Sequence, residues 1–316
     1  MQNAKCKVQS YRILTLCTLR SALCVYRDDR MNGIVIIDKP QEWTSQDVTA
    51  RLRRVFNTRR IGHGGTLDPM ATGVLPVFVG RATRGVEFFE HAEKTYEAVL
   101  RLGITTDTED ITGTVLEEKK VEISEQEFLD ILPQFRGEIQ QIPPMYSALK
   151  IDGQKLCDLA RKGKTVERKP RPVTIHELTC LEFSGNTARL RVRCSKGTYI
   201  RTLCKDIGEA LGCGGCMEQL RRVQAGAYTI AESVPLAVLL ESEAPDTYLR
   251  PVDSMFTRYP AVKLTPKQAQ RCRNGNSFSI QLPEGTYRAY DENGEFLAIS
   301  QVTEGTMSTV KSFFEV

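Results

Sequence analysis

The pattern of hydrophobic and polar residues after Met31 predicts three strands and a helix in the first third of the chain. GIVIIDKP at 33–40 is continuously apolar at its centre, which is typical of a buried strand. In TSQDVTARLRRVF at 44–56, a polar start precedes apolar residues at helical spacing. These residues share one face of the predicted helix: Val48, Leu52, Val55 and Phe56. VLPVFVG at 74–80 and TYEAVLRL at 95–102 are the other predicted strands.

Later segments predict two helices with a hairpin between them. SEQEFLDIL at 124–132 opens with a capping box from Ser124 to Glu127. VTIHELTCLEF and TARLRVRC are strands joined by a Ser-Gly-Asn turn. Alternation in the second strand puts a basic stripe on its outer face, formed by Arg189, Arg191 and Arg193. GTYIRTLCKDIGEALG is a helix that ends at Gly212.

The order of these elements predicts an α+β fold with a mixed, largely antiparallel central sheet flanked by helices and loops, because strands and helices do not alternate regularly. A boundary near 242–251 separates a domain at 31–245 from a small β-rich module at 250–316. Within the module, Thr265 caps one short helix that Gly275 ends. Residues 1–30 show no clear hydrophobic period, and we interpret them as a disordered extension, an upstream-start artefact or a targeting peptide.

Composition narrows the class of protein. Of the 316 residues, 41% are hydrophobic and 26% charged, as in soluble globular proteins. No apolar run approaches the roughly 18 residues that cross a bilayer, so no membrane role is expected. The ten cysteines are scattered and expected to be reduced. Cys213 and Cys216 lack a second pair and the three histidines lack ligand spacing, so no metal site is predicted. TTDTEDITG at 105–113 does not match a calcium loop and is interpreted as a plain loop.

Positive charge is concentrated in two segments. Residues 150–171 carry a net charge of +5 and residues 1–30 carry +4, whereas the whole chain carries only +4. Concentrated positive charge favours a polyanion, because each neutralised phosphate releases counterions. A solvated lysine-rich loop explains the charge equally well. The candidates for contact with an RNA backbone are Lys150, Lys155, Arg161, Lys162 and Lys164.

The stretch GGTLDPMATG at 64–73 can neither pack a core nor continue a helix. Asp-Pro near glycine ordinarily begins a surface turn, but Asp68 could also be a nucleophile or base on a rigid loop. Arg201 could clamp its carboxylate through two charge-assisted hydrogen bonds, which is expected to lower the pKa of Asp68. Tyr96 could stack on a base or pack within its strand. His63 could contact a nucleotide or be an exposed turn residue.

Six motifs occur here in the order and spacing of one protein family. They are GHGGTLDPMATGVLP, KTYEAVLRLG, TDTEDITG, PPMYSALKIDGQKLCDLAR, CSKGTYIRTLCKDIG and Leu-Arg-Arg at 220–222. From residue 31 to about 235 the sequence resembles the TruB-type tRNA pseudouridine-55 synthases. The tail resembles the small PUA-like RNA-binding domain of that family. The resemblance therefore implies the pseudouridine synthase fold, with a basic RNA-clamping insertion at about 142–171.

The resemblance also implies an activity, which is isomerisation of uridine 55 in the T loop of tRNA to pseudouridine, with no metal or organic cofactor. Asp68 would be the catalytic aspartate and Arg201 its ion-pair partner. Tyr96 would lie against the uracil and accept the proton from carbon 5. The other substrate-binding residues would be His63, Tyr199 and Leu220. The expected partner is the T arm of tRNA, and the protein is expected to be monomeric and cytoplasmic.

Three questions stay open at this point. The target base must be flipped out, because its glycosidic bond cannot be cut and remade through carbon within a stack. The carboxylate then either adds to the sugar or the base, or removes a sugar proton to give a glycal. A non-catalytic tRNA-binding chaperone on the same scaffold is the alternative function, and a tRNA-folding activity is also compatible with catalysis.

The sequence departs from the family's first motif at one position. The family has glycine where KPQEWTS has Glu42, and a positive φ at this residue would strain the turn by roughly 1 kcal/mol.

Overall fold

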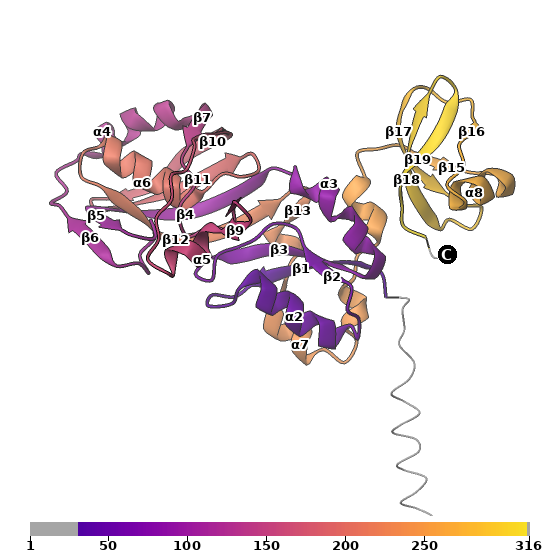
Figure 1. Ribbon diagram of the computed structural model, residues 1–316, viewed down its shortest axis with the longest axis horizontal. Helices are drawn as coiled ribbons and strands as arrows, with labels where there is room; N and C mark the ends of the chain where they lie inside the picture. The colour runs from indigo at the N-terminus through magenta and orange to yellow at the C-terminus, as the bar shows by residue number, and fades with distance from the viewer. Residues whose placement is uncertain (1–30, 315–316) are drawn as a thin grey trace, which may run out of the picture.

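The computed structural model describes residues 31–314, so the predicted extension at 1–30 lies outside the described residues. Its larger sheet contains β1 Gly33–Lys39, β2 Ile61–His63, β3 Thr72–Val79, β4 Lys94–Leu102, β7 Gly137–Gln141, β10 Arg171–Ser184, β11 Thr187–Cys194, β12 Gly215–Ala225, β13 Tyr228–Thr229 and β14 Val234–Pro235. The main path runs β14-β1-β3-β12-β4-β11-β10-β7 (Figure 1). The pairs β1–β14 and β3–β12 are parallel and the other pairs are antiparallel. This confirms the predicted mixed, largely antiparallel sheet.

Helices lie around this sheet, and the sequence predicted three of them, at 44–56, 124–132 and 197–212. The helices are α2 Ser45–Val55, α3 Val86–Glu90, α4 Glu125–Ile131, α5 Leu156–Ala160, α6 Ile200–Ala210 and α7 Leu236–Glu241. The 3-10 turns are η1 Gly80–Gly85, η2 Leu132–Phe135, η3 Ile230–Glu232, η4 Pro245–Tyr248 and η5 Val252–Phe256. Thr44 caps α2, and Ser124 and Glu127 form the predicted capping box of α4. Gly212 follows α6 with φ 78°, as a helix-ending glycine should.

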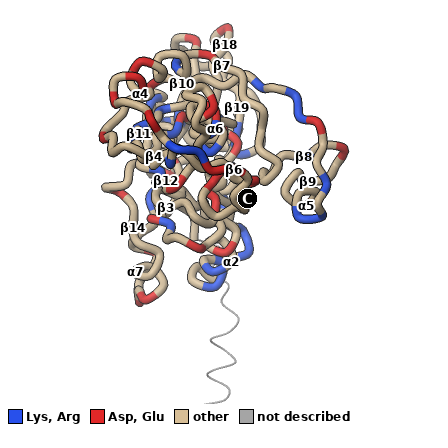
Figure 2. Tube along the Cα trace, turned by 90° about the vertical axis from the view of Figure 1, so that its left-hand side faces the viewer, with Lys and Arg blue, Asp and Glu red and all other residues tan. Residues whose placement is uncertain are grey.

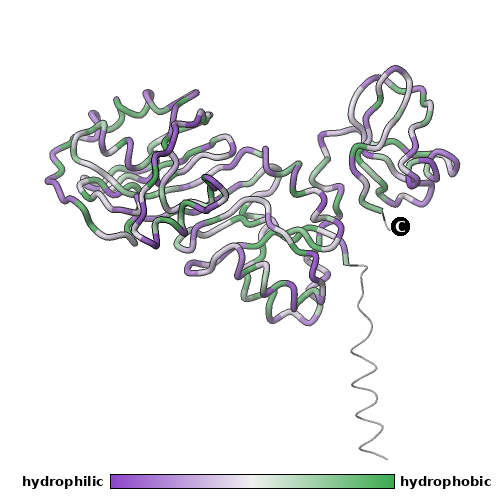
Figure 3. Tube along the Cα trace, in the orientation of Figure 1, coloured by the Kyte–Doolittle hydropathy of each residue, from purple (hydrophilic) through white to green (hydrophobic). Residues whose placement is uncertain are grey.

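The centre of the sheet is buried on both faces. Val35 and Ile37 of β1 belong to the main core, which also contains apolar residues of α2 and α7. Ile34 and Ile36 belong to a second cluster on the opposite face, together with Phe89 of α3. Figure 3 shows hydrophobic residues concentrated in the strands and in the helices around them. This double burial explains why β1 is a continuous apolar run instead of an alternating one.

The predicted hairpin is formed by β10 and β11, and its arginines are paired. Arg193 lies 2.8 Å from Glu93, and Arg191 lies 3.9 Å from carboxylate oxygens of Glu97 and Glu177. Arg189 also pairs with Glu97. The basic stripe that the alternation predicted is therefore matched by carboxylates of the neighbouring segments.

A second, smaller sheet follows in the chain, with its own core. Its strands are β15 Ala261–Lys263, β16 Phe278–Ser279, β17 Gly285–Tyr290, β18 Phe296–Thr303 and β19 Thr306–Ser312, in the order β15-β17-β18-β19-β16. Helix α8, Pro266–Arg273, has Thr265 as its cap, as predicted. Two small hairpins complete the described strands, β5 Ile104–Thr106 with β6 Val115–Glu118, and β8 Lys150–Ile151 with β9 Gln154–Lys155.

The small module packs beside α3 of the larger part (Figure 1). The ring of Phe256 lies 5.3 Å from that of Phe88 and 5.6 Å from that of Phe313. Arg84 donates to the carbonyl oxygen of Ser312 at 3.0 Å. Within residues 31–314 we find no helix that is long and apolar enough to span a bilayer.

Candidate active site

Asp68 lies in the connection between β2 and β3, and the residue before it is fixed by α2. The hydroxyl of Ser45 accepts a hydrogen bond from the Leu67 amide at 2.8 Å and donates to the Leu67 carbonyl at 3.2 Å. The Ala71 amide donates to the Asp68 carbonyl at 3.0 Å. Asp68 therefore does begin a turn, and the turn holds its side chain in a fixed position.

Pro69, the residue after Asp68, is held by Lys39, the last residue of β1. The ammonium of Lys39, which is fully buried, donates to the carbonyl oxygens of Pro40, Trp43 and Pro69 at 2.8, 2.7 and 3.3 Å. Burial lowers the pKa of Lys39 to about 8. The amide of Glu42 donates to the same Pro69 carbonyl at 2.8 Å. Glu42 has φ 68°, so the strain expected for a non-glycine residue at this position is present.

Gly64 in this connection and Gly73 at the start of β3 allow close backbone approach. A Cβ at Gly64 would lie 2.5 Å from the ring of Phe89, and one at Gly73 would lie 2.2 Å from the carbonyl oxygen of Arg222. Gly73 also has φ 100°, a conformation that side chains disfavour. The glycines therefore let the connection pack against α3 and β12.

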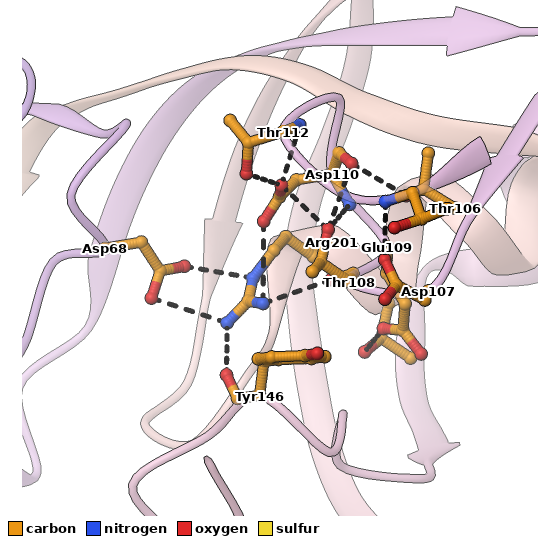
Figure 4. A network of polar contacts seen from close by, with 11 residues as sticks. Asp68, Thr106, Asp107, Thr108, Glu109, Asp110, Thr112, Tyr146 and Arg201 are labelled. Atoms are coloured by element: carbon orange, nitrogen blue, oxygen red, sulfur yellow. Dashed lines mark hydrogen bonds and ion pairs between the residues drawn. The ribbon is translucent and has the colours of Figure 1, made fainter. Parts of the chain in front are cut away.

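Arg201, in the first turn of α6, joins Asp68 to a second aspartate (Figure 4). Its Nε lies 3.0 Å from Asp68 Oδ2, and its Nη2 lies 3.4 Å from Asp68 Oδ1. Its Nη1 lies 3.6 Å from Asp110 Oδ2. The guanidinium also donates to the carbonyl oxygens of Thr108 and Tyr146, at 3.1 and 2.9 Å. All three guanidinium nitrogens are thus engaged, and their positions are fixed.

Asp110 is a residue of this network that sequence reasoning missed. It lies in the predicted loop, is 6% exposed, and accepts at Oδ1 from the hydroxyls of Thr108 and Thr112 at 2.9 and 2.6 Å. The Thr112 amide also donates to Oδ1, at 3.0 Å. Threonines two residues before and after an aspartate are the local signal that could have identified it, because such side chains hold one another in turns.

Pairing with Arg201 lowers the pKa of Asp68, as expected, but the net shift of that pKa is upward. Burial raises the pKa of Asp68, and the neighbouring Asp110 carboxylate adds to the rise, although Arg201 and Lys39 oppose it. Asp68 therefore has an ion-pair partner in Arg201. Its ionised form is nevertheless less favourable than that of a carboxylate in water. Such a carboxylate is a stronger base and nucleophile.

A cavity of about 870 Å³ opens in front of this pair. Tyr96 of β4 and Leu220 of β12, each 8% exposed, lie on its wall. Burial raises the pKa of Tyr96 and lowers the pKa of His63, whose Nε2 lies 3.3 Å from Gln46. The cavity brings together these sequence-predicted residues: His63, Asp68, Tyr96, Arg161, Tyr199, Arg201 and Leu220.

Two buried cations in the cavity wall were not predicted. Arg222, 1% exposed, donates to the carbonyl oxygens of Val74 and Gly65 at 2.7 and 3.1 Å. Lys94 is 8% exposed, and burial lowers its pKa to about 8. Both belong to recognised motifs, but their common location depends on the register of β12 on β4, which places Arg222 opposite Tyr96.

The basic insertion, which carries β8, β9 and α5, stands out from the body of the protein (Figure 2), and a few of its residues, Cys157 among them, line the cavity. The carbonyls of Ser147 and Leu149 accept from the amides of Cys157 and Leu156 at 3.0 and 2.8 Å, which closes the segment into a compact loop. The insertion contains the five candidates for contact with an RNA backbone: Lys150, Lys155, Arg161, Lys162 and Lys164. All five are exposed, and of these only Arg161 lines the cavity. No group of three potential metal ligands occurs among the described residues 31–314.

Two family models match consecutive parts of the chain. The TruB family pseudouridylate synthase N-terminal domain matches residues 53–200, and the tRNA pseudouridylate synthase B C-terminal domain matches residues 201–257. The tRNA pseudouridine synthase B of Stutzerimonas stutzeri (strain A1501) is 45% identical over 284 residues, which cover 87% of this chain and 92% of that protein. The tRNA pseudouridine synthase B of Dechloromonas aromatica (strain RCB) is 45% identical over 279 residues, with 87% and 93% covered.

Solved structures share the fold. A chain in an H/ACA RNP bound to a substrate RNA containing 2′-deoxyuridine superposes with a TM-score of 0.69 at 23% identity, covering 91% of this chain and 86% of that one. A chain in a Cbf5-Nop10-Gar1 complex gives a TM-score of 0.69 at 25% identity, with 90% and 85% covered.

Proposed function

The chain belongs to the TruB family of pseudouridylate synthases, and we propose that it isomerises uridine 55 in the T loop of tRNA to pseudouridine. Family membership makes it an isomerase, and the relatives named above are tRNA pseudouridine synthases. The observation that carries the proposal is the Asp68–Arg201 pair at 3.0 Å, which faces a cavity whose wall includes Tyr96. A binding protein has no need for an ion-paired carboxylate in such a place.

The cavity has the size and lining for one flipped nucleotide. Its volume of about 870 Å³ lies within the range of small-ligand sites. In the proposed complex, the uracil lies against Tyr96, with Tyr199 and Leu220 around it, and the ribose faces Asp68. His63, at the rim, helps to keep the nucleotide out of its stack.

The reaction replaces the C1′–N1 bond by a C1′–C5 bond, and the base loses a proton at C5 and gains one at N1. The Asp68 carboxylate either adds to C1′ of the ribose or to the base, or removes the C2′ proton to give a glycal. When the C1′–N1 bond breaks, its electron pair leaves with the base. The base turns and C5 bonds to C1′ as any bond from Asp68 breaks, or as the proton held by Asp68 returns to C2′ of the glycal. The C5 proton passes to the hydroxyl oxygen of Tyr96, which gives up its own phenolic proton, and N1 gains a proton. Arg201 fixes Asp68 throughout, and Asp110 fixes Arg201.

RNA contacts outside the cavity come from two regions. The insertion at about 142–171 lies within a catalytic domain at 31–245 and grips the T arm through its exposed lysines and arginines. The β-rich module at 250–316 acts as a PUA-like RNA-binding domain. The enzyme works as a monomer in the cytoplasm and uses no metal or organic cofactor.

The test is to incubate unmodified tRNA with the protein and with Asp68→Asn, in the presence of a metal chelator. Pseudouridine is mapped by carbodiimide-blocked primer extension. A single stop at position 55, absent for Asp68→Asn while the variant still binds tRNA, supports the proposal. Tight binding without any stop would favour the non-catalytic chaperone, and a stop at another uridine would correct the target.

A further inference from the structure

Lys94 presents a buried ammonium to the cavity from the first position of β4. It lies two residues before Tyr96, so the two side chains share one face of the strand at about 7 Å along it. Its one hydrogen-bond acceptor among the described residues is the carbonyl oxygen of Glu90, at 3.3 Å. No carboxylate of residues 31–314 lies within ion-pair distance of it, even though an ammonium has three donors.

The groups around Lys94 make this end of the cavity positive. Arg222 approaches from β12 and Lys196 from the loop after β11, and both disfavour the charged form of Lys94. Cys194 of β11 and Glu90 of α3 favour it more weakly than burial opposes it. Buried cations are normally paired, so two neighbouring cations in a cavity wall with no carboxylate partner for Lys94 indicate a site for negative charge.

The negative charge of the reaction develops in the right place for this site. The register of β12 on β4 places Arg222 opposite Tyr96, and Lys94 lies two residues before Tyr96 on the same face of β4, so both cations lie beside Tyr96 in the cavity wall. A uracil that lies against Tyr96 with its ribose towards Asp68 therefore also lies beside Lys94 and Arg222. When the C1′–N1 electron pair leaves with the base, the resulting charge is shared among N1, O2 and O4.

We propose that Lys94 donates a hydrogen bond to a carbonyl oxygen of the target uracil and stabilises the anionic base while it is detached from the ribose. The inference rests on the proposed function. It adds a residue that touches the reacting base beside Tyr96. The charge disappears again when C5 bonds to C1′, the C5 proton is lost and N1 is protonated. A donor fixed before the reaction needs no rearrangement at that moment, which is why such groups are effective.

The experiment compares Lys94→Gln, Lys94→Arg and the matched control Lys120→Gln, a lysine on the surface that is 83% exposed. Release of tritium from carbon 5 of the uridines in tRNA is followed under single-turnover conditions, with tRNA affinity measured separately. Lys94→Gln is expected to lower the rate of the bound complex about 100-fold with little change in affinity. Lys94→Arg should recover part of the rate, and Lys120→Gln should match the unaltered protein.

The pH profile gives a second readout that does not depend on the glutamine variant folding. The rate should fall as the pH rises through about 8, where Lys94 loses its proton, and this loss should disappear in Lys94→Arg. A loss that persists in Lys94→Arg belongs to another group, such as Lys39, and overturns the inference. An unchanged single-turnover rate with weaker binding in Lys94→Gln makes Lys94 a phosphate contact and also overturns it. If the unaltered protein forms no pseudouridine, the proposed function itself has failed.

Discussion

The network around Arg201 and the basic insertion both consist of polar side chains, but Arg201 is buried and paired whereas the lysines of the insertion are exposed. Arg201 is 5% exposed and each of its guanidinium nitrogens has a partner (Figure 4). The lysines of the insertion are exposed on a loop that stands out from the body (Figure 2). Chemistry at one bond depends on position to within a fraction of an ångström, whereas attraction of a phosphate backbone depends mainly on charge. The two regions should therefore respond differently to substitution.

The largest effect is expected for Asp110→Asn, which removes one charge from the network. Arg201 loses an ion pair, and the resulting loss of alignment at Asp68 should lower the single-turnover rate about 100-fold. The salt dependence of tRNA binding should not change. Asp107→Asn is the matched control, because Asp107 lies in the same loop and bonds to the Thr114 amide instead of Arg201.

The same variant makes a prediction about pH. Asp110 contributes to the raised pKa of Asp68, so its neutralisation should lower that pKa. Activity that needs the Asp68 carboxylate is present above its pKa and is lost as the pH falls through it. The acid limb of the rate profile should therefore move to lower pH in Asp110→Asn. A limb that stays in place would mean that the two carboxylates do not interact.

A smaller effect is expected when the insertion loses charge. Replacing Lys155, Lys162 and Lys164 by alanine should weaken tRNA binding and reduce the slope of log affinity against log salt by roughly one per lysine that contacts a phosphate. The rate of the bound complex should be unchanged, since none of the three lines the cavity. A lower single-turnover rate with the original salt slope would show that the insertion acts on the pocket and not on the backbone of the RNA.

The smallest effect concerns the strained turn beside the network. Glu42→Gly should stabilise the protein by about 1 kcal/mol, because glycine adopts φ 68° without a Cβ clash. Thermal unfolding measures this. Glu42→Ala is the control, since alanine keeps the strain and should show no gain. A glycine variant that is less stable than the original would mean that the Glu42 side chain contributes more than its strain costs.

Features that depend on residues close together in the sequence could be predicted, whereas features that depend on contacts between distant segments could not. Ser124, Gly212 and Thr265 mark helix ends through local hydrogen bonds or a local φ, and each lies where expected. The hairpin of β10 and β11 follows from alternation and one turn.

The missed features depend on the fold. Asp110 became part of the site only because α6 brings Arg201 to it, and Lys94 and Arg222 meet through the register of two strands. The net rise of the Asp68 pKa was not predicted, because a motif shows the partner of a carboxylate but not its burial. The resemblance to a family supplied the catalytic set, and the structure supplied the groups that hold it.

The edge of the larger sheet bears on the order in which the chain folds during synthesis. β1 is completed by β14, through the pair Ile37 and Val234, and by two backbone hydrogen bonds between Ile34 and Arg250 at 2.9 Å. A nascent chain that ends just after Arg222 therefore contains every residue that lines the cavity and still has one bare edge on β1. The ribosome must release about 30 more residues before that edge can close. Closure of the sheet is thus a late event of translation, and the small module emerges directly behind it.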